Sequence, residues 1–164
     1  MSNVKTAEEQ ITMTREGYEK LKSELVHLRS DGRMEIGRQL EEARSFGDLS
    51  ENAEYHAAKE AQAKLESRIL WLESQLGKAK VIDAKDLDTS RVTLGTTVEM
   101  VDLESQKEFV YTIVGSEESD PARLRISSAS PVGQALLGAE VGNEVLVRAP
   151  KGVRKLRITR ISIP

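Results

Sequence analysis

The sequence predicts an α+β protein, in which a long antiparallel α-helical coiled-coil hairpin precedes a small antiparallel-sheet domain with one helix. Apolar residues recur every three or four positions up to residue 80 and alternate within short β-branched runs beyond it. Only 4% of the residues are aromatic and 31% are charged, so part of the chain is expected to bury little, as a solvated helical rod does. We therefore expect a helical hairpin at residues 1–80, a linker at 81–88 and a sheet domain at 89–164.

The first helix is expected from about Arg15 to Ser45. Thr14 is a suitable N-cap for it, and Glu16 in its first turn suits the helix dipole. Its apolar stripe, which the Asp31-Gly32 pair interrupts, consists of Tyr18, Leu21, Leu25, Leu28, Ile36, Leu40 and Ala43. At 1.5 Å per residue, such a helix would be about 46 Å long, so the hairpin is predicted to be a thin rod.

The second helix has a stricter apolar repeat, which is typical of a coiled coil. Its seam alternates steps of four and three residues through Ala58, Gln62, Leu65, Ile69, Leu72, Leu76 and Ala79. The two helical segments meet at residues 46–49 (Phe-Gly-Asp-Leu). A break this short between helices with matching seams makes them antiparallel neighbours.

The region after residue 88 reads as a sheet. Its β-branched runs, separated by Gly, Asp, Ser and Pro, cover residues 91–101, 108–115, 123–128, 143–150 and 154–163. One helix is expected among them, because Ser130 is a good N-cap, Pro131 suits the first helical position and Gly138 suits the end.

Composition excludes several classes of function. The chain has no cysteine, which excludes disulfides and thiolate metal sites and fits a cytoplasmic location. Its first residues lack the apolar run of a signal peptide, and no segment approaches the roughly 20 apolar residues of a membrane span. The net charge is −3, whereas proteins that wrap duplex DNA usually carry a basic field. Any contact with nucleic acid should therefore be local or organised by a partner.

The predicted hairpin tip, residues 47–58, carries two carboxylates three residues apart. If Asp48 is an N-cap, Glu51 takes the third helical position, and the pair forms a capping box with Asp in place of Ser or Thr. Glu54 adds a third acid in the first turn, where the helix dipole also favours acids. The spacing by itself favours this structural interpretation and leaves a chemical role open.

The stretch from Glu42 to Glu60, EARSFGDLSENAEYHAAKE, resembles the hairpin tip of the GreA family of bacterial transcript cleavage factors. Further similar segments are Met13-Thr14 with Gly17 and Leu21, and residues 80–83, 95–98, 111–115, 130–133 and 136–138. The resemblance covers nearly all of the chain from Thr12 and is highly specific, because a long, rare motif agrees with the two-part architecture.

This resemblance implies a fold and a partner. The C-terminal domain would have a fold like that of FK506-binding proteins and would dock on the rim of the secondary channel of RNA polymerase. The docking segment would include Ser130, Pro131, Leu136 and Leu137. The hairpin would enter the channel, where the nascent RNA 3′ end is extruded when the polymerase backtracks. The protein would act as a monomer that activates the polymerase's own nuclease and would not itself be an enzyme.

Asp48 and Glu51 match the catalytic pair of this family. Hydrolysis of a phosphodiester can use two metal ions that activate a water and stabilise the leaving oxygen. The resemblance implies that both carboxylates help to hold a second Mg²⁺, shared with the polymerase, and orient its water. Which residue does which is left open. Two carboxylates are too few for a dedicated Mg²⁺ site, so none is expected on the isolated protein.

Other tip residues are assigned by the same comparison. Arg44 and Lys59 are expected to contact the extruded RNA, and Arg33 and Arg38 could extend this basic track. Gly47 suits the backbone of a tight turn between helices.

For four further tip residues the sequence leaves two interpretations open. Phe46 and Leu49 pack the turn or touch the polymerase wall. Asn52 and Tyr55 contact RNA or polymerase, or form hydrogen bonds on the helix surface. An acid–base role for His56 is a weaker alternative than a surface position.

Three other functions are weighed. A non-cleaving inhibitor of the same family would carry an altered, more acidic tip, whereas GDLSENAEY keeps the cleaving pattern. A coiled-coil adaptor would use its tip acids only as helix caps. A prolyl isomerase would need an apolar pocket, and the second half of the chain offers only Phe109 and Tyr111 as aromatic residues.

Overall fold

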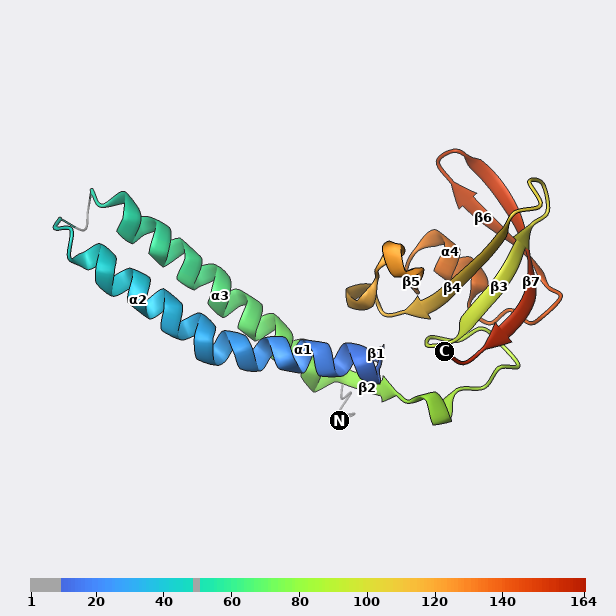
Figure 1. The fold of residues 1–164 in the computed structure, drawn as a ribbon, viewed down its shortest axis with the longest axis horizontal. Coiled ribbons are helices and arrows are strands. Elements are labelled where there is room, and N and C mark those ends of the chain that lie inside the picture. The colour runs from blue at the N-terminus through green and yellow to red at the C-terminus, as the bar shows by residue number, and fades with distance from the viewer. Residues whose placement is uncertain (1–9, 49–50) are drawn as a thin grey trace, which may run out of the picture. The chain divides into compact units, whose positions relative to one another are not determined.

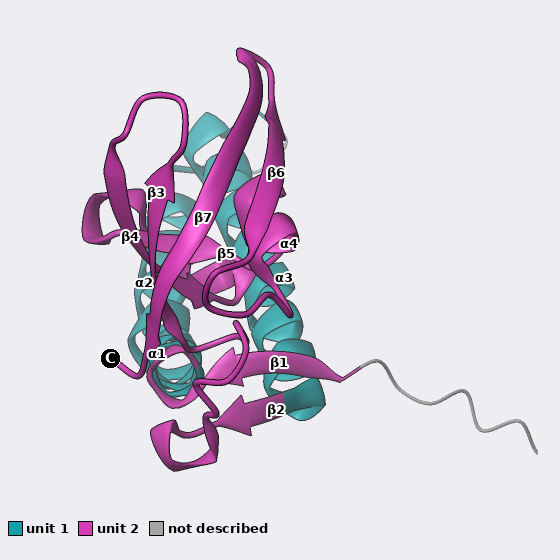
Figure 2. Cartoon of the chain, turned by 90° about the vertical axis from the view of Figure 1, so that its right-hand side faces the viewer, with its two compact units in different colours: residues 1–9, 18–79 teal, residues 10–17, 80–164 magenta. Residues whose placement is uncertain are grey.

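A computed structural model describes residues 10–48 and 51–164 of the chain (Figure 1). The described residues divide into two compact units, which are coloured separately in Figure 2. One is Tyr18–Ala79, and the other combines Gln10–Gly17 with Lys80–Pro164. The predicted fold class is confirmed, since a helical hairpin precedes a mostly antiparallel sheet that carries one helix.

The first unit is the predicted hairpin. Its elements are α1 (Arg15–His27), the π-helical turn η1 (Leu28–Gly32), α2 (Arg33–Arg44) and α3 (Ala53–Lys78). Figure 1 shows α2 and α3 running side by side in opposite directions, joined at one end by the tip. The hydroxyl of Thr14 accepts a hydrogen bond from the backbone N–H of Gly17 (3.1 Å), which confirms Thr14 as the cap of α1. None of the helices in the described part combines the length and apolar character that a membrane span needs.

The interruption at Asp31-Gly32 does not break the first helix. The backbone passes through η1, a π-helical turn, and continues as α2. A π turn holds one more residue than an α turn, so it rotates the following side chains about the helix axis. This rotation returns Leu40 and Ala43 to the seam, where both are buried. Gly32 sits in the turn, and a β-carbon there would lie 3.1 Å from a methyl carbon of Leu65.

The seam and its flanking ion pairs set the register of the hairpin. The buried seam residues are Leu21, Leu25, Leu40, Ala43, Ala58, Ile69 and Leu72. Arg68 donates two hydrogen bonds to Glu24 (2.8 and 3.0 Å), and Arg33 donates two to Glu66 (both 3.0 Å). These pairs are partly exposed, so each adds little stability, but their forked geometry accepts only one alignment of the helices.

The second unit holds two sheets. Strands β1 (Ile11–Thr14) and β2 (Ala79–Ile82) form a two-stranded sheet, and a 3₁₀ turn, η2 (Ala84–Asp86), follows β2. The larger sheet has the order β5-β4-β3-β7-β6. Its strands are β3 (Thr97–Asp102), β4 (Glu108–Val114), β5 (Arg125–Ser127), β6 (Glu144–Ala149) and β7 (Gly152–Ser162). All neighbours are antiparallel except β4 and β5. The 3₁₀ turns η3 (Ser116–Glu118) and η4 (Pro121–Arg123) lie between β4 and β5, and helix α4 (Pro131–Leu136) lies between β5 and β6.

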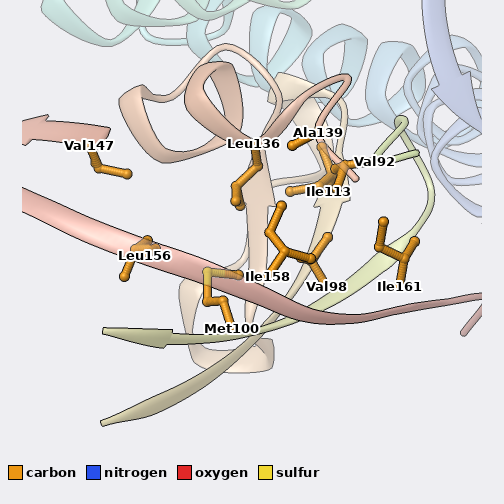
Figure 3. Packing of buried hydrophobic residues seen from close by; sticks show 10 residues of the cluster. All are labelled: Val92, Val98, Met100, Ile113, Leu136, Ala139, Val147, Leu156, Ile158 and Ile161. Carbon is orange, nitrogen blue, oxygen red and sulfur yellow. The ribbon is translucent and has the colours of Figure 1, made fainter. Parts of the chain in front are cut away.

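One face of the larger sheet packs against α4 and forms the core (Figure 3). Alternate residues of each strand point to this face, as the period of two requires. The core residues are Val92, Val98, Met100, Ile113, Leu136, Ala139, Val147, Leu156, Ile158 and Ile161.

At the N-terminal end, the division into two units differs from the predicted domain at residues 1–80. Residues 10–17 belong to the second unit, because β1 pairs with β2 and because Glu118 holds the start of α1. The Glu118 carboxylate accepts hydrogen bonds from the backbone and hydroxyl of Thr14 and from the backbone of Gly115. A β-carbon on Gly17 would overlap this carboxyl group, so the site requires glycine. The predicted linker at 81–88 contains the end of β2 and the turn η2.

Asp102 holds the turn that joins β3 to β4. The residue is 5% exposed, and its side chain accepts hydrogen bonds from the backbone of Glu104 (2.9 Å) and Ser105 (3.2 Å) and from Arg154 (3.1 Å). The guanidinium of Arg154 also lies 4.8 Å above the ring of Phe109. These hydrogen bonds, with that from Ser105 the largest influence, hold the pKa of Asp102 below its ordinary value of 3.8.

Replacing Asp102 by Asn should lower the unfolding temperature at pH 7 by a few degrees, because the ion pair with Arg154 is lost while an oxygen acceptor remains. A carboxylate with a lowered folded pKa stabilises the fold above pH 3.8, and this contribution disappears as the pH falls through the folded value. The gap between Asp102→Asn and the parent should therefore narrow at pH 3. Thermal unfolding followed by circular dichroism at both pH values tests this, and a gap independent of pH would contradict it.

Candidate functional site

The tip of the hairpin lies between the end of α2 at Arg44 and the start of α3 at Ala53. The residue Gly47, whose φ is +110°, has the left-handed backbone that glycine adopts without strain, as predicted for this position. Asp48 follows it directly and is exposed, and Glu51 is also exposed. Residues 49 and 50 lie outside the described part, and with them the interpretation of Leu49. Phe46 is 65% exposed, so it does not pack the turn and is available to a partner.

Asn52 holds the two helices together at the tip. Its side-chain oxygen accepts a hydrogen bond from the backbone N–H of Tyr55 (3.1 Å), which caps α3. Its side-chain nitrogen donates a hydrogen bond to the carbonyl oxygen of Ala43 (2.6 Å), in the last turn of α2. One amide thus satisfies a free donor at the start of one helix and contacts the end of the other. Of the two interpretations of Asn52, the structure therefore shows the structural one.

The capping-box interpretation of the two acids is wrong. Helix α3 begins at Ala53 with Asn52 as its cap, so Glu51 precedes the cap and cannot occupy the third helical position. Asp48 lies four residues before the cap. The two carboxylates lie before the start of α3, and neither of them is the residue that caps this helix. A chemical role for Asp48 and Glu51 stays a prediction.

The side chains of Asp48 and Glu51 offer oxygen ligands of the type that binds Mg²⁺. Carboxylate oxygens are the hard ligands that Mg²⁺ prefers, and the ion keeps several waters or takes further ligands from a substrate. Among the described residues, no group of three or more His, Asp or Glu side chains is placed to hold a metal ion. The part played by Asp48 and Glu51 in a site shared with another molecule stays a prediction.

One flank of the tip is basic and aromatic. The guanidinium of Arg44 lies 6.0 Å from the centre of the Tyr55 ring, and Tyr55 also contacts His56 edge-on at 5.9 Å. Lys59 follows Tyr55 by one turn and donates a hydrogen bond to Gln62 (3.1 Å). The structure thus brings Arg44, Tyr55 and Lys59 together on one side of the seam.

The other predicted members of the basic track are already paired. Arg33 binds Glu66, and Arg38 binds both Glu35 (2.7 Å) and Glu42 (3.1 Å). A cation that is held by neighbouring carboxylates attracts a phosphate less strongly than a free one. Arg33 and Arg38 therefore extend the track less effectively than their positions in the sequence suggest.

The other flank of the tip holds an acidic groove that sequence reasoning missed. It has a volume of about 280 Å³ and is lined by Gln39, Glu42, Ala43, Glu54, Ala57 and Ala58. At about 100° per residue, Glu54 and Ala57 lie on one side of the seam residue Ala58, whereas Tyr55 and Lys59 lie on the other. Of the groove's two carboxylates, that of Glu42 is paired with Arg38 (3.1 Å). The alternation of Ala and Glu was visible in the sequence, but without the helix pairing it did not define a groove.

The segment predicted to dock on a partner is built around α4. Ser130 caps this helix by accepting a hydrogen bond from the backbone N–H of Gly133 (3.1 Å), and Pro131 occupies its first position, as predicted. Pro131 is exposed and Leu137 is 38% exposed. The prediction that Leu136 contacts the partner needs correction, because its side chain is fully buried in the core. Leu136 can support docking only by holding the segment in place.

Comparisons with known proteins identify relatives over nearly the whole chain. Residues 11–81 match the family model described as the transcription elongation factor N-terminal domain, and residues 87–163 match that of the GreA/GreB C-terminal domain. Transcription elongation factor GreA of Clostridioides difficile is 49% identical over 149 residues, which cover 91% of this chain and 94% of that protein. GreA of Acetivibrio thermocellus is 45% identical over 152 residues, covering 93% and 96%.

Solved structures are also similar. The GreA factor homolog 1 (Gfh1) protein of Thermus thermophilus is 31% identical with a TM-score of 0.42, covering 93% of this chain and 98% of that one. The GreA/GreB elongation factor of Nitrosomonas europaea is 25% identical with a TM-score of 0.42 and the same coverage.

Asn52→Ala should destabilise the hairpin by about 1–2 kcal/mol, because a helix cap and a hydrogen bond between the helices are both lost. Asn52→Asp keeps the capping oxygen but lacks the N–H that reaches Ala43, so its loss should be smaller. Urea unfolding followed by helical circular dichroism measures both. Equal stability of Asn52→Ala and the parent would show that the amide does not hold the tip.

Proposed function

Because this chain belongs to the GreA/GreB family of transcription elongation factors, we propose that it enters the secondary channel of RNA polymerase and activates cleavage of backtracked RNA. Its family makes this chain a transcription elongation factor. The proposal adds the cleavage step, the RNA substrate and the state of a cytoplasmic monomer. The observation that carries the proposal is the tip: a loop with exposed Asp48 and Glu51, braced by Asn52 between two helix ends.

The reaction assigned to the tip is hydrolysis of an internal phosphodiester of the extruded RNA. A water oxygen forms a bond to phosphorus while the bond to the 3′ oxygen breaks, which leaves a new 3′ hydroxyl for extension. A Mg²⁺ shared with the polymerase would lower the pKa of this water and stabilise charge on the leaving oxygen. Asp48 and Glu51 would supply oxygen ligands and accept hydrogen bonds from the water. Because the polymerase supplies the remaining groups, this chain is an activator and not itself the catalyst.

The two flanks of the tip support an orientation for the RNA. Phosphates of the extruded strand would lie along Arg44 and Lys59, and the Tyr55 ring beside them offers a surface on which a base can stack. The groove lined by Glu54 would face away from the strand, because this carboxylate has the same sign of charge as the phosphates, whereas Glu42 is paired with Arg38. The docking function is assigned to the second unit, including the exposed Pro131 and Leu137 beside α4.

Asp48→Asn and Glu51→Gln should each reduce factor-dependent RNA cleavage by about 100-fold or more, because a charged oxygen ligand is lost at the reacting centre. Both should still bind polymerase, because neither residue caps α3 and the hairpin should remain folded. Glu60→Gln, which removes a carboxylate from α3 beyond the tip, is the control and should cleave like the parent. The measurement is cleavage of end-labelled RNA in stalled elongation complexes.

Raised Mg²⁺ should partly restore cleavage by Glu51→Gln, because a weaker site fills at a higher concentration. Parent-like cleavage by both Asp48→Asn and Glu51→Gln would exclude the metal-ligand role. Undiminished cleavage at low Mg²⁺ by Glu51→Gln alone would restrict that role to Asp48.

Lys59→Glu should lower cleavage by about tenfold at a subsaturating concentration of the factor, because it reverses a charge beside the phosphates. For the same reason, crosslinking of the RNA 3′ segment to the factor should decrease. Polymerase binding should change little. Lys64→Glu is the control, because Lys64 lies on the same helix, is 77% exposed and pairs with Glu60. If the two variants crosslink RNA equally well, Lys59 is a solvated surface residue without a part in RNA binding.

A further inference from the structure

The outer face of the β6–β7 hairpin carries a compact group of apolar and basic side chains. The hairpin pairs Glu144 with Arg157, Leu146 with Lys155, and Arg148 with Val153. These six residues point away from the core, because their neighbours Val147 and Leu156 are buried on the opposite face. We name this set of three cross-strand pairs the β6–β7 ladder. Figure 2 shows that the hairpin extends beyond the neighbouring strands of the sheet.

Two large apolar side chains of the ladder are open to solvent. Leu146 is 60% exposed and Val153 is 57% exposed. They occupy diagonal positions on adjacent strands, where side chains come within reach of each other. The solvent face of an antiparallel sheet is normally polar, so two neighbouring exposed aliphatic residues on its edge hairpin indicate a surface that a partner covers.

The charge of the ladder is positive. Glu144 accepts hydrogen bonds from both Arg157 (2.7 Å) and Lys155 (3.1 Å), so its carboxylate is neutralised within the ladder. Arg148 forms no ion pair with any residue in the part of the chain that the structure describes. A partner that supplies a carboxylate near Arg148 would therefore form an ion pair that this cation lacks within the described part of the chain.

The edge of the sheet offers a second mode of contact. Strand β6 is the last strand in the order β5-β4-β3-β7-β6, and it pairs with β7 on one side only. The backbone groups on its other side can pair with an added strand from another protein. An extended segment that adds to β6 would bring its side chains directly beside Leu146 and Arg148.

From this arrangement we propose that the β6–β7 ladder binds an acidic, apolar segment of RNA polymerase, with aliphatic side chains over Leu146 and Val153 and a carboxylate against Arg148. The proposal rests on the proposed function, because it names polymerase as the partner. Single-stranded RNA fits less well, since such binding uses aromatic rings on which bases stack and the ladder has none. Phosphates would also leave the two aliphatic side chains exposed.

The test compares the full-length double variant Leu146→Ser/Arg148→Glu with the parent in binding to polymerase elongation complexes. The variant should bind about tenfold or more weakly, which corresponds to about 1.4 kcal/mol. At saturating concentration it should still stimulate cleavage, because the tip is unchanged. The matched control Val110→Ser/Lys107→Glu removes an exposed aliphatic residue and a cation elsewhere in the same unit and should bind like the parent.

Thermal unfolding of both double variants separates a binding defect from a folding defect. A single Arg148→Glu variant, which keeps Leu146, should show a weaker dependence of binding on salt than the parent. A photo-crosslinking residue at Leu146 should attach to polymerase protein. Parent-like affinity of Leu146→Ser/Arg148→Glu, or crosslinking of Leu146 to RNA, would overturn the proposal. If the parent binds polymerase but does not stimulate cleavage, the proposed function is contradicted. The binding data would still support the β6–β7 ladder as a polymerase-binding surface.

Discussion

The arrangement at the hairpin tip depends on the two hydrogen bonds of the Asn52 amide. A helix end leaves donors or acceptors without partners inside the helix, and a turn between two helices places both kinds of end together. The Asn52 oxygen serves the first turn of α3 and its nitrogen serves the last turn of α2, at Ala43. The side-chain amide of Asn offers an acceptor oxygen and a donor nitrogen on separate atoms, so one residue can serve both helix ends. Because Asn52 is the cap of α3, Asp48 and Glu51 lie before the helix start, in the loop.

The hairpin below the tip supports this arrangement through size and charge. Small seam residues, Ala43 and Ala58, let the two helices approach closely at the end that carries the site. Larger seam residues such as Ile69 and Leu72, both fully buried, supply the apolar area further along α3. Flanking ion pairs, including Arg33 with Glu66, select the alignment. The same alignment separates a basic flank with Lys59 from an acidic groove with Glu54, which gives the tip two faces of different charge.

Sequence patterns predicted the elements that local chemistry defines. Thr14 and Ser130 act as caps where the pattern placed them, and Gly47 has the positive φ of a tight turn. The cap of α3 was not predictable, because Asp48, Ser50 and Asn52 are all good capping residues. The bond from Asn52 to Ala43, nine residues earlier, is a tertiary contact that distinguishes Asn52 from the others.

Three further features depend on contacts that a local pattern cannot show. Strand β1 exists because it pairs with β2, which lies more than 60 residues away in the chain. The π turn at η1 needs the second helix, against which it restores the seam. Leu136 lies in a helix of six residues, too short for its periodicity to separate a buried side from an exposed one.

The central claim is that this chain makes RNA polymerase cleave its own backtracked transcript. The direct measurement adds the purified full-length protein to backtracked elongation complexes that carry end-labelled RNA and follows the RNA length over time in Mg²⁺. The account predicts rapid shortening of the transcript, dependent on the factor, followed by renewed extension when nucleotides are supplied. A transcript whose length and arrest are unchanged by saturating, polymerase-bound factor would contradict it.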